Sequence, residues 1–255
     1  MILVDRPNLP CGNVKHLIAG GLPQSVKNEL SAFHIEVIEP IKDISLPKYL
    51  NFHSDMLYHY FGNGKMGISE GQKAVCPVLG KLGINDIHCI RLGNQYPLDV
   101  KLNVCTFGSN VIINLNTADK TVVDFYKKNG YNIINVKQGY SKCAVAVIDD
   151  CSVITEDEGI YSAVSKHKNI DILKIKKGYV RLNGYDCGFI GGAAGKISDR
   201  LMFINGDIKK HPDFDNISDF LKQHNVDYVC LSSAHITDIG GIIPLTIHKE
   251  GEVTL

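Results

Sequence analysis

The chain has 255 residues with 27 acidic and 27 basic side chains, and its pI is near 7.1. This balanced charge excludes the strongly basic surface that binds nucleic acid or anionic membranes. No stretch reaches the ~18 apolar residues of a membrane-spanning helix, and the N-terminus lacks the apolar segment of a signal peptide. We therefore expect a cytoplasmic protein without nucleic-acid or membrane partners, folded as a single domain over residues 1–255.

The N-terminal part predicts a strand at 16–20, a helix at 23–34 and a strand at 35–39. Four later stretches follow one plan: a polar residue, an apolar hairpin, an amphipathic helix and a short apolar strand. Their hairpin regions are 53–68, 97–115, 140–155 and 185–205. Their last strands are expected at 84–90, 131–136, 169–175 and 226–231, and we interpret the strand at 131–136 as buried.

One of the helices carries clear start and stop signals. Thr117 precedes its first turn, and Lys127, Lys128 and Gly130 follow its apolar residues. A small hydroxyl residue before a helix, and Lys followed by Gly after it, are typical of helix ends. Each of the four stretches is therefore interpreted as a β-β-α-β unit.

The polar residues that open the hairpins recur at nearly constant spacing, which is typical of a repeat architecture. These anchor residues lie 44, 43 and 44 residues apart, at Asp55, Asp99, Lys142 and Asp186. The step to the next anchor residue, Asp238, is 52 residues, and we attribute the excess to an inserted loop at 206–215.

The two ends of the chain together supply a fifth unit. The N-terminal segment lacks a first strand, and the segment 239–247 is a strand with no helix after it. We expect strand 239–247 to pair beside strand 16–20, because closing a ring of units removes exposed sheet edges. The sequence thus predicts an α/β fold, a five-fold pseudo-symmetric α/β propeller closed by its C-terminal strand.

In such a ring the anchor residues converge near the central axis. A capping role for each Asp, through hydrogen bonds to the turn before its strand, is the simpler interpretation. Several converging carboxylates instead need a cation, a ligand or raised pKa values to offset their repulsion. The predicted ligand-binding residues are His53, Asp55, Asp99, Lys142, Asp186 and Asp238.

Five β-β-α-β units in a ring resemble the pentein fold. This is the α/β propeller of arginine and agmatine deiminases, dimethylarginine hydrolase and the amidinotransferases, and a ribosome anti-association factor has it without catalysis. The resemblance covers essentially the whole chain and depends on the repeat, with weak local similarity. It implies a site at the axis for a small cationic, amino-acid-like or guanidino-like ligand.

Catalytic penteins use a Cys nucleophile, a His general acid/base and carboxylates that hold the guanidinium. Their carboxylates lie in R-D and E-G-G motifs, and the corresponding positions here keep an acid in Asp55 and Asp99. Their G-H-x-D motif is replaced by a stretch in which Tyr140 stands for the His and Lys142 for the acid. Pro244 occupies the position of the Cys. The resemblance therefore implies ligand binding without the standard Cys–His chemistry.

The alternative is an active hydrolase or amidinotransferase-type enzyme, so the sequence leaves open whether the chain is an enzyme. Cys187 is the candidate nucleophile, with His235 or His53 to lower its pKa across the ring. A divalent-metal site from His53, Asp55, His235 and Asp238 is a further alternative. We expect no cofactor, and the sequence does not give the ligand or the oligomeric state.

Two other interpretations concern partners and phosphate. A protein-binding module like the ribosomal factor is a third functional class, against which the balanced charge argues. The glycine-rich run at 188–195 suggests a phosphate cradle, but no helix is expected after it. We interpret these glycines as positions of close backbone approach.

Overall fold

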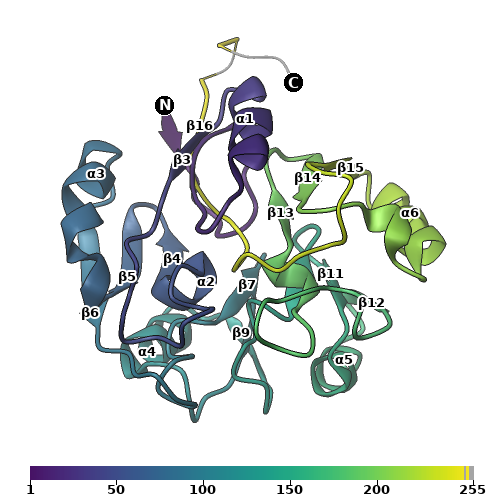
Figure 1. Cartoon of the computed structure of the whole chain (residues 1–255). Coiled ribbons are helices and arrows are strands. Elements are labelled where there is room, and N and C mark those ends of the chain that lie inside the picture. Colours follow the sequence, from purple (N-terminus) through teal and green to yellow (C-terminus); the bar gives the residue numbers. More distant parts are fainter. Residues whose placement is uncertain (250, 253–255) are drawn as a thin grey trace.

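A computed structural model describes residues 1–249 and 251–252; residues 250 and 253–255, which the expected domain 1–255 includes, lie outside the described part. The chain forms five small sheets around a common centre, each with a helix on its outer side (Figure 1). These outer helices are α1 (Gln24–Ala32), α3 (Cys76–Lys81), α4 (Lys120–Lys128), α5 (Glu158–Val164) and α6 (Phe214–Gln223). No helix in the described part is long and apolar enough to cross a membrane.

Four sheets have three strands each, an antiparallel hairpin followed by a parallel outer strand. In chain order they are β4 (Tyr58–Gly62), β5 (Lys65–Ser69) and β6 (Asp86–Ile90); β7 (Cys105–Phe107), β8 (Asn110–Ile113) and β9 (Asn132–Asn135); β10 (Val145–Val147), β11 (Ser152–Thr155) and β12 (Asp171–Lys174); β13 (Ala194–Lys196), β14 (Leu201–Ile204) and β15 (Asp227–Cys230). The outer helix lies between the second and third strands of each unit. The predicted β-β-α-β pattern and the α/β fold of five units are confirmed.

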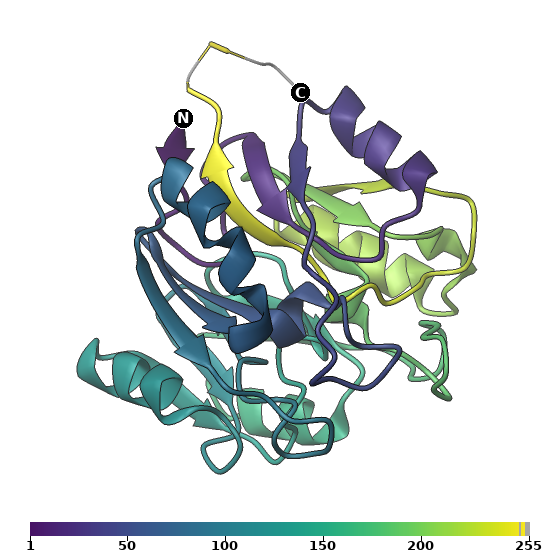
Figure 2. The ribbon, with the colours of Figure 1, turned by 60° about the vertical axis from the view of Figure 1, so that its left-hand side comes forward.

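The fifth sheet joins the two ends of the chain. Its strands lie in the order β1 (Ile2–Leu3), β16 (Ile243–Ile247), β2 (Val14–Ile18) and β3 (Glu36–Ile38). In Figure 2 the yellow strand β16 lies beside the purple strand β2, and Ile243 pairs with Ile18. The predicted ring closure is therefore confirmed, although the sequence did not indicate β1.

The inner and outer strands differ in burial. Every residue of β7, β8, β10 and β11 is buried, whereas β9 has only Ile134 buried. The prediction of a buried strand at 131–136 is thus wrong for most of its length. The outer strand is the edge of its sheet, so side chains on one of its faces meet solvent.

Capping residues, turn residues and apolar runs in the sequence predicted the ends of most helices and strands to within a few residues. Helix α4 starts later than Thr117 suggests, because the Asp119 side chain accepts a hydrogen bond from Thr121 N at 2.9 Å. The segment 206–215 is not a simple loop: it contains the 3-10 helix η3 (Ile208–Lys210) and the start of α6. Three further short helices were not expected: α2 (Ser54–Leu57), η1 (Glu70–Val75) and η2 (Ile190–Gly192).

Candidate functional site

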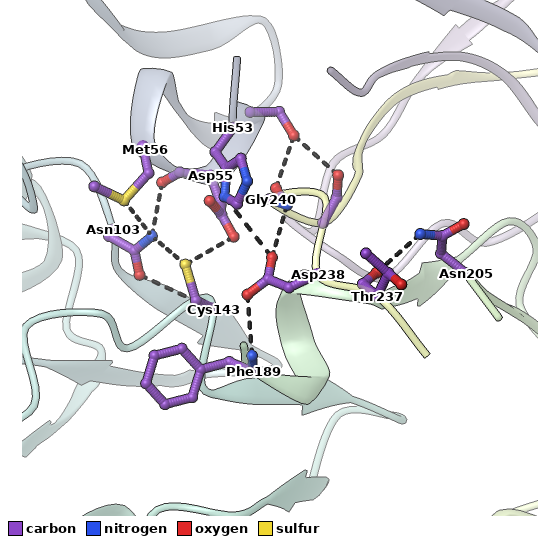
Figure 3. A network of polar contacts seen from close by, with 12 residues as sticks. His53, Asp55, Met56, Asn103, Cys143, Phe189, Asn205, Thr237, Asp238 and Gly240 are labelled. Carbon is purple, nitrogen blue, oxygen red and sulfur yellow. Dashed lines mark hydrogen bonds and ion pairs between the residues drawn. The ribbon is translucent and has the colours of Figure 1, made fainter. Parts of the chain in front are cut away.

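Residues from all five units meet at the centre, and their hydrogen bonds close into a ring. Figure 3 shows the part of it around Asp55, Asn103 and Cys143. Asp55 N donates to Gly240 O at 3.0 Å, and Asn103 Nδ2 donates to Asp55 O at 3.1 Å. Asn103 Oδ1 accepts from Cys143 N at 3.2 Å, and Cys143 O accepts from Gly192 N at 2.9 Å. Gly192 O then accepts from Gly241 N at 2.7 Å. We call Asp55, Asn103, Cys143, Gly192 and the pair 240–241 the axial ring.

The glycines of the ring leave no room for a side chain. A Cβ on Gly192 would lie 2.1 Å from Asp238 Oδ1, and one on Gly240 would lie 2.4 Å from His53 Cβ. Gly191 approaches a backbone in the same way, since its Cβ would lie 2.2 Å from Val145 O. These contacts support the interpretation of the glycine-rich run as a place of close backbone approach.

Asp238 and His53 face each other across the ring. His53 Nδ1 lies 3.7 Å from Asp238 Oδ1, and their side chains are 8% and 1% exposed. Asp238 also accepts hydrogen bonds from Phe189 N at 3.0 Å and Gly240 N at 2.8 Å. Burial raises the pKa of Asp238 to about 6, with the charge of Asp55 adding to the rise and His53 opposing it.

Cys143 is held as a thiol against Asp55. Its Sγ donates to Asp55 Oδ2 at 3.0 Å and lies 2.9 Å from the donor Asn103 Nδ2. Burial, and then the nearby Asp55, raise the pKa of Cys143 well above its usual value. Because the thiolate is the nucleophilic form of cysteine, this environment disfavours Cys143 as a nucleophile.

Tyr140 and Asp99 form the next polar pair. The Tyr140 hydroxyl donates to Asp99 Oδ2 at 2.7 Å, and Asp99 is 2% exposed. Burial and this hydrogen bond raise the pKa of Tyr140 far above its usual value. The hydroxyl therefore stays protonated and serves as a donor to Asp99 rather than as a proton acceptor.

Glu156 completes a cluster of buried acids that the sequence reasoning did not include. It directly follows β11, is 7% exposed, and its Oε1 accepts a hydrogen bond from Ile190 N at 2.9 Å. Burial raises the pKa of Glu156 to about 8, and the charge of Asp238 adds to the rise. We call Asp55, Asp99, Glu156 and Asp238 the acid cluster.

The acid cluster has unused hydrogen-bonding capacity. Among the described residues, the buried side-chain polar atoms without a hydrogen-bond partner are Asp55 Oδ1, Asp99 Oδ1, Glu156 Oε2, His53 Nδ1 and Ser152 Oγ. All but the Ser152 hydroxyl belong to the cluster or to His53 beside it. Buried polar groups are normally paired, so this concentration marks a place built for something besides folding.

A cavity of about 570 Å³ opens onto His53 and Asp238. Its walls come from the turn between β2 and α1, the segment 42–53, Leu182 and Asn183, and the segment 232–239. The cavity is therefore shared by the first unit, the fifth unit and the segment that leads into the second unit. It gives a ligand access to one edge of the acid cluster.

The structure places the remaining predicted site residues in different surroundings. His235 lines the cavity and is exposed, whereas Asp186 is exposed and Cys187 is half-buried, and neither lines the cavity. No hydrogen bond joins Cys187 to His235 in the described part of the chain. Lys142 is 7% exposed; it shares a cavity of about 20 Å³ with Asp55 and one of about 10 Å³ with Pro244.

The described residues do not provide a ligand set for the alternative of a divalent-metal site. Among residues 1–249 and 251–252, no group of three or more His, Cys, Asp or Glu side chains is arranged to hold a metal ion. His53 and Asp238 lie close together, but Asp55 bonds to the Cys143 thiol and His235 lies at the exposed part of the cavity wall.

Sequence reasoning also missed Asn103, although a signal was present. Constant spacing selected Asp99 and Asp186 as the central residues of their units, whereas the axial ring contains Asn103 and Gly192. The stretch from the anchor residue to the first hairpin strand is longer before β7 and β13 than before β4 and β10, so equal steps in sequence miss the axis. The polar residue nearest to each hairpin strand would have been the better guide for Asn103.

Solved structures that superpose on this chain include two amidinotransferases and an agmatine deiminase. Inosamine-phosphate amidinotransferase from Streptomyces griseus superposes with a TM-score of 0.58 at 10% identity, covering 100% of this chain and 99% of its own. An amidinotransferase of saxitoxin biosynthesis from Microseira wollei gives 0.58 at 8% identity, covering 99% of both chains. Agmatine deiminase from C. jejuni gives 0.53 at 11% identity, covering 89% of this chain and 91% of its own. These likenesses establish the pentein fold.

Comparison of the amino-acid sequence with known proteins and families gives a more specific result than the fold. No curated protein matches it in sequence. The model of a family described as "Family of unknown function (DUF6873)" matches residues 17–243. That range contains the acid cluster and the whole axial ring, and it covers far more than half of the sequence. The chain therefore belongs to the DUF6873 family.

Proposed function

We propose that this protein binds a small cationic ligand, amino-acid-like or guanidino-like, at the acid cluster. The ligand enters through the cavity of about 570 Å³, and its cationic group lies against Asp238 with His53 beside it. The charges of Asp55 and Glu156 act on Asp238 and add negative potential, and Asp99 is a further buried acid of the cluster. The names of the structural neighbours, amidinotransferases and a deiminase, are consistent with a guanidino-like ligand.

The observation that carries this proposal is the set of unpaired carboxyl oxygens. Asp55 Oδ1, Asp99 Oδ1 and Glu156 Oε2 are buried and accept no hydrogen bond. A carboxyl group held in that state is costly, and the raised pKa values of Glu156 and Asp238 are the response of the unliganded protein. A cation bound against Asp238 brings positive charge to the edge of the acid cluster and lowers both pKa values.

Binding without standard amidinohydrolase chemistry follows from the residues at the reactive positions. Pro244 supplies no thiol, and Tyr140 holds its proton toward Asp99. The buried Cys143 has a raised pKa, which disfavours the thiolate that a nucleophile needs. Nothing in the surroundings of Cys187 favours it as a replacement, because it does not line the cavity.

Replacing Asp238 by asparagine should remove cation binding. We expect agmatine, arginine or methylguanidine to raise the melting temperature of the natural protein and to bind measurably by calorimetry. Asp238→Asn should weaken that binding at least ~30-fold, since losing one partner of a buried charge pair costs about 2 kcal/mol or more. A melt without ligand checks that the variant is folded.

Asp215→Asn is the matched control, because Asp215 is exposed in the first turn of α6, away from the cavity. It should bind the cation like the natural protein. Equal affinity of Asp238→Asn and the natural protein would reject the acid cluster as the binding site. No binding of any of the three cations would reject the guanidino-like ligand class.

A further inference from the structure

The outer wall of the same cavity is built from groups that attract anions. The strand β2 is followed by Gly20 and Gly21, and then by the start of α1; Gly20, Gly21 and Ser25 all line the cavity. Gly21 has φ +66°, a left-handed conformation that glycine adopts without strain, and a Cβ there would touch nothing within 4 Å. The turn therefore presents open backbone to the cavity.

Helix α1 begins without an acceptor for its first donors. Its N-cap residue is Pro23, which offers no side-chain acceptor, and the first turn contains no acidic residue. The first hydrogen bond into the helix runs from Lys27 N to Pro23 O at 3.1 Å. The N–H groups of Gln24, Ser25 and Val26 thus have no acceptor within the described chain, and the positive end of the helix faces the cavity wall.

Charged side chains reinforce this positive end. Lys42 and Lys48 line the cavity, are exposed, and form no ion pair within the part of the chain that the structure describes. The carboxylate of the cavity, Asp238, lies on its floor beside His53. An anion therefore finds cations and free N–H donors at the outer wall and meets a carboxyl group only deeper in.

A buried side chain with an unpaired ring nitrogen lies in the same cavity as the start of the helix. His53 is 7% exposed, lines the cavity, and its Nδ1 has no hydrogen-bond partner. Gly20 brings it close to the turn, because a Cβ on Gly20 would lie 1.8 Å from Phe52 O. The backbone at Phe52 thus packs directly on the glycine turn.

We propose that the wall formed by Gly20, Gly21, Ser25, Lys42 and Lys48 is a binding site for a phosphate group. Phosphate fits better than a carboxylate because it offers more acceptor oxygens to three N–H groups, a hydroxyl and two ammonium groups. The site is separate from the proposed cation site, although both open to one cavity. A ligand that fills the cavity then carries a phosphate and a cationic group.

Ser25→Asp separates phosphate binding from folding. A carboxylate in the first turn of α1 repels phosphate but favours the helix dipole, so the variant should fold with an unchanged or higher melting temperature. At constant ionic strength, about 20 mM inorganic phosphate should raise the melting temperature of the natural protein. Calorimetry should show phosphate binding weakened at least ~10-fold in Ser25→Asp and several-fold in Lys48→Gln.

Two variants serve as matched controls. Asn216→Asp adds the same charge to the first turn of α6, and Lys127→Gln removes a lysine from α4; both positions lie outside the cavity. Both controls should bind phosphate like the natural protein. Phosphoethanolamine distinguishes two sources of the group: tighter binding than inorganic phosphate indicates a phosphorylated small molecule, and equal binding indicates free phosphate.

The proposal is overturned if the natural protein shows no phosphate-dependent rise in melting temperature, or if Ser25→Asp binds phosphate with unchanged affinity. The proposed cation site is judged separately with methylguanidine. That probe carries no phosphate, so its binding should survive Ser25→Asp and disappear in Asp238→Asn. A negative result for phosphate binding therefore does not change the conclusion about cation binding, and the reverse also holds.

Discussion

Replacing Asn103 by alanine should lower the free energy of unfolding by about 4 kcal/mol, because several buried backbone groups lose their partner at once. Asn103 is 1% exposed, and its Oδ1 accepts from Lys142 N at 2.8 Å and Cys143 N at 3.2 Å. Its Nδ2 donates to Asp55 O at 3.1 Å. The side chain thus links three of the five units, and its loss opens the axial ring. Urea unfolding of the purified protein measures the change.

Two further variants show which atoms matter. Asn103→Asp keeps an acceptor for the two N–H groups but loses the donor and places a second carboxyl group beside Asp55, so it should also destabilise strongly. Asn129→Ala removes an exposed amide that bonds Phe125 O at 2.8 Å, and it should cost less than about 1 kcal/mol. If Asn103→Ala cost no more than Asn129→Ala, the axial ring would have no part in holding the units together.

The unliganded protein should be less stable at pH 8 than at pH 5, and Glu156 should be the main cause. The pKa of Glu156 is raised from 4.5 to about 8, and that of Asp238 from 3.8 to about 6. Between those values the folded protein holds protons that the unfolded chain has already lost. Unfolding then releases protons, so the free energy of unfolding falls as the pH rises through this window.

Glu156→Gln tests this assignment. Glutamine keeps the acceptor for Ile190 N and removes the charge, so it should stabilise the protein at pH 8 by on the order of 2 kcal/mol and leave it nearly unchanged at pH 5. Glu158→Gln is the control, because Glu158 is exposed and pairs with Lys174 on the surface. Denaturant unfolding at several pH values gives the comparison. If the free energies of unfolding of Glu156→Gln and of the natural protein changed with pH in parallel, the buried proton would belong to a group other than Glu156.

Amino-acid sequence was sufficient for the ring of units because each unit repeats strong local signals. Helix ends such as that after Lys128, and the apolar runs that become β9 and β15, depend on neighbours in sequence. The closing strand could be inferred because the first unit lacked one. Contacts at the axis depend instead on loop lengths, and these vary between units. The constant spacing therefore selected Asp55 and Lys142 at the axis but missed Asn103 and Gly192.

Glu156 could have been recognised from a second repeated position. In three units the polar residue that directly follows the middle strand bonds to the backbone of the connection that leads to the next unit. Asn114 Nδ2 donates to Lys137 O at 2.8 Å, Asn205 Nδ2 donates to Thr237 O at 2.9 Å, and Glu156 Oε1 accepts from Ile190 N at 2.9 Å. An amide is sufficient for this link in two of the units. The third unit has the carboxyl group of Glu156 at this position instead. One of its oxygens is buried and unpaired, and this exception indicates a ligand.

The position of β16 between β1 and β2 constrains how the protein folds during synthesis. The other four units can form as soon as their own segments have left the ribosome, because each uses strands that are close in sequence. The first unit must wait, since β2 has an unpaired edge until residues 243–247 emerge. An exposed strand edge is a template for pairing with other chains. The nascent chain therefore carries this aggregation-prone edge from the emergence of β2 until β16 emerges, and contacts of such high sequence separation make closure slow.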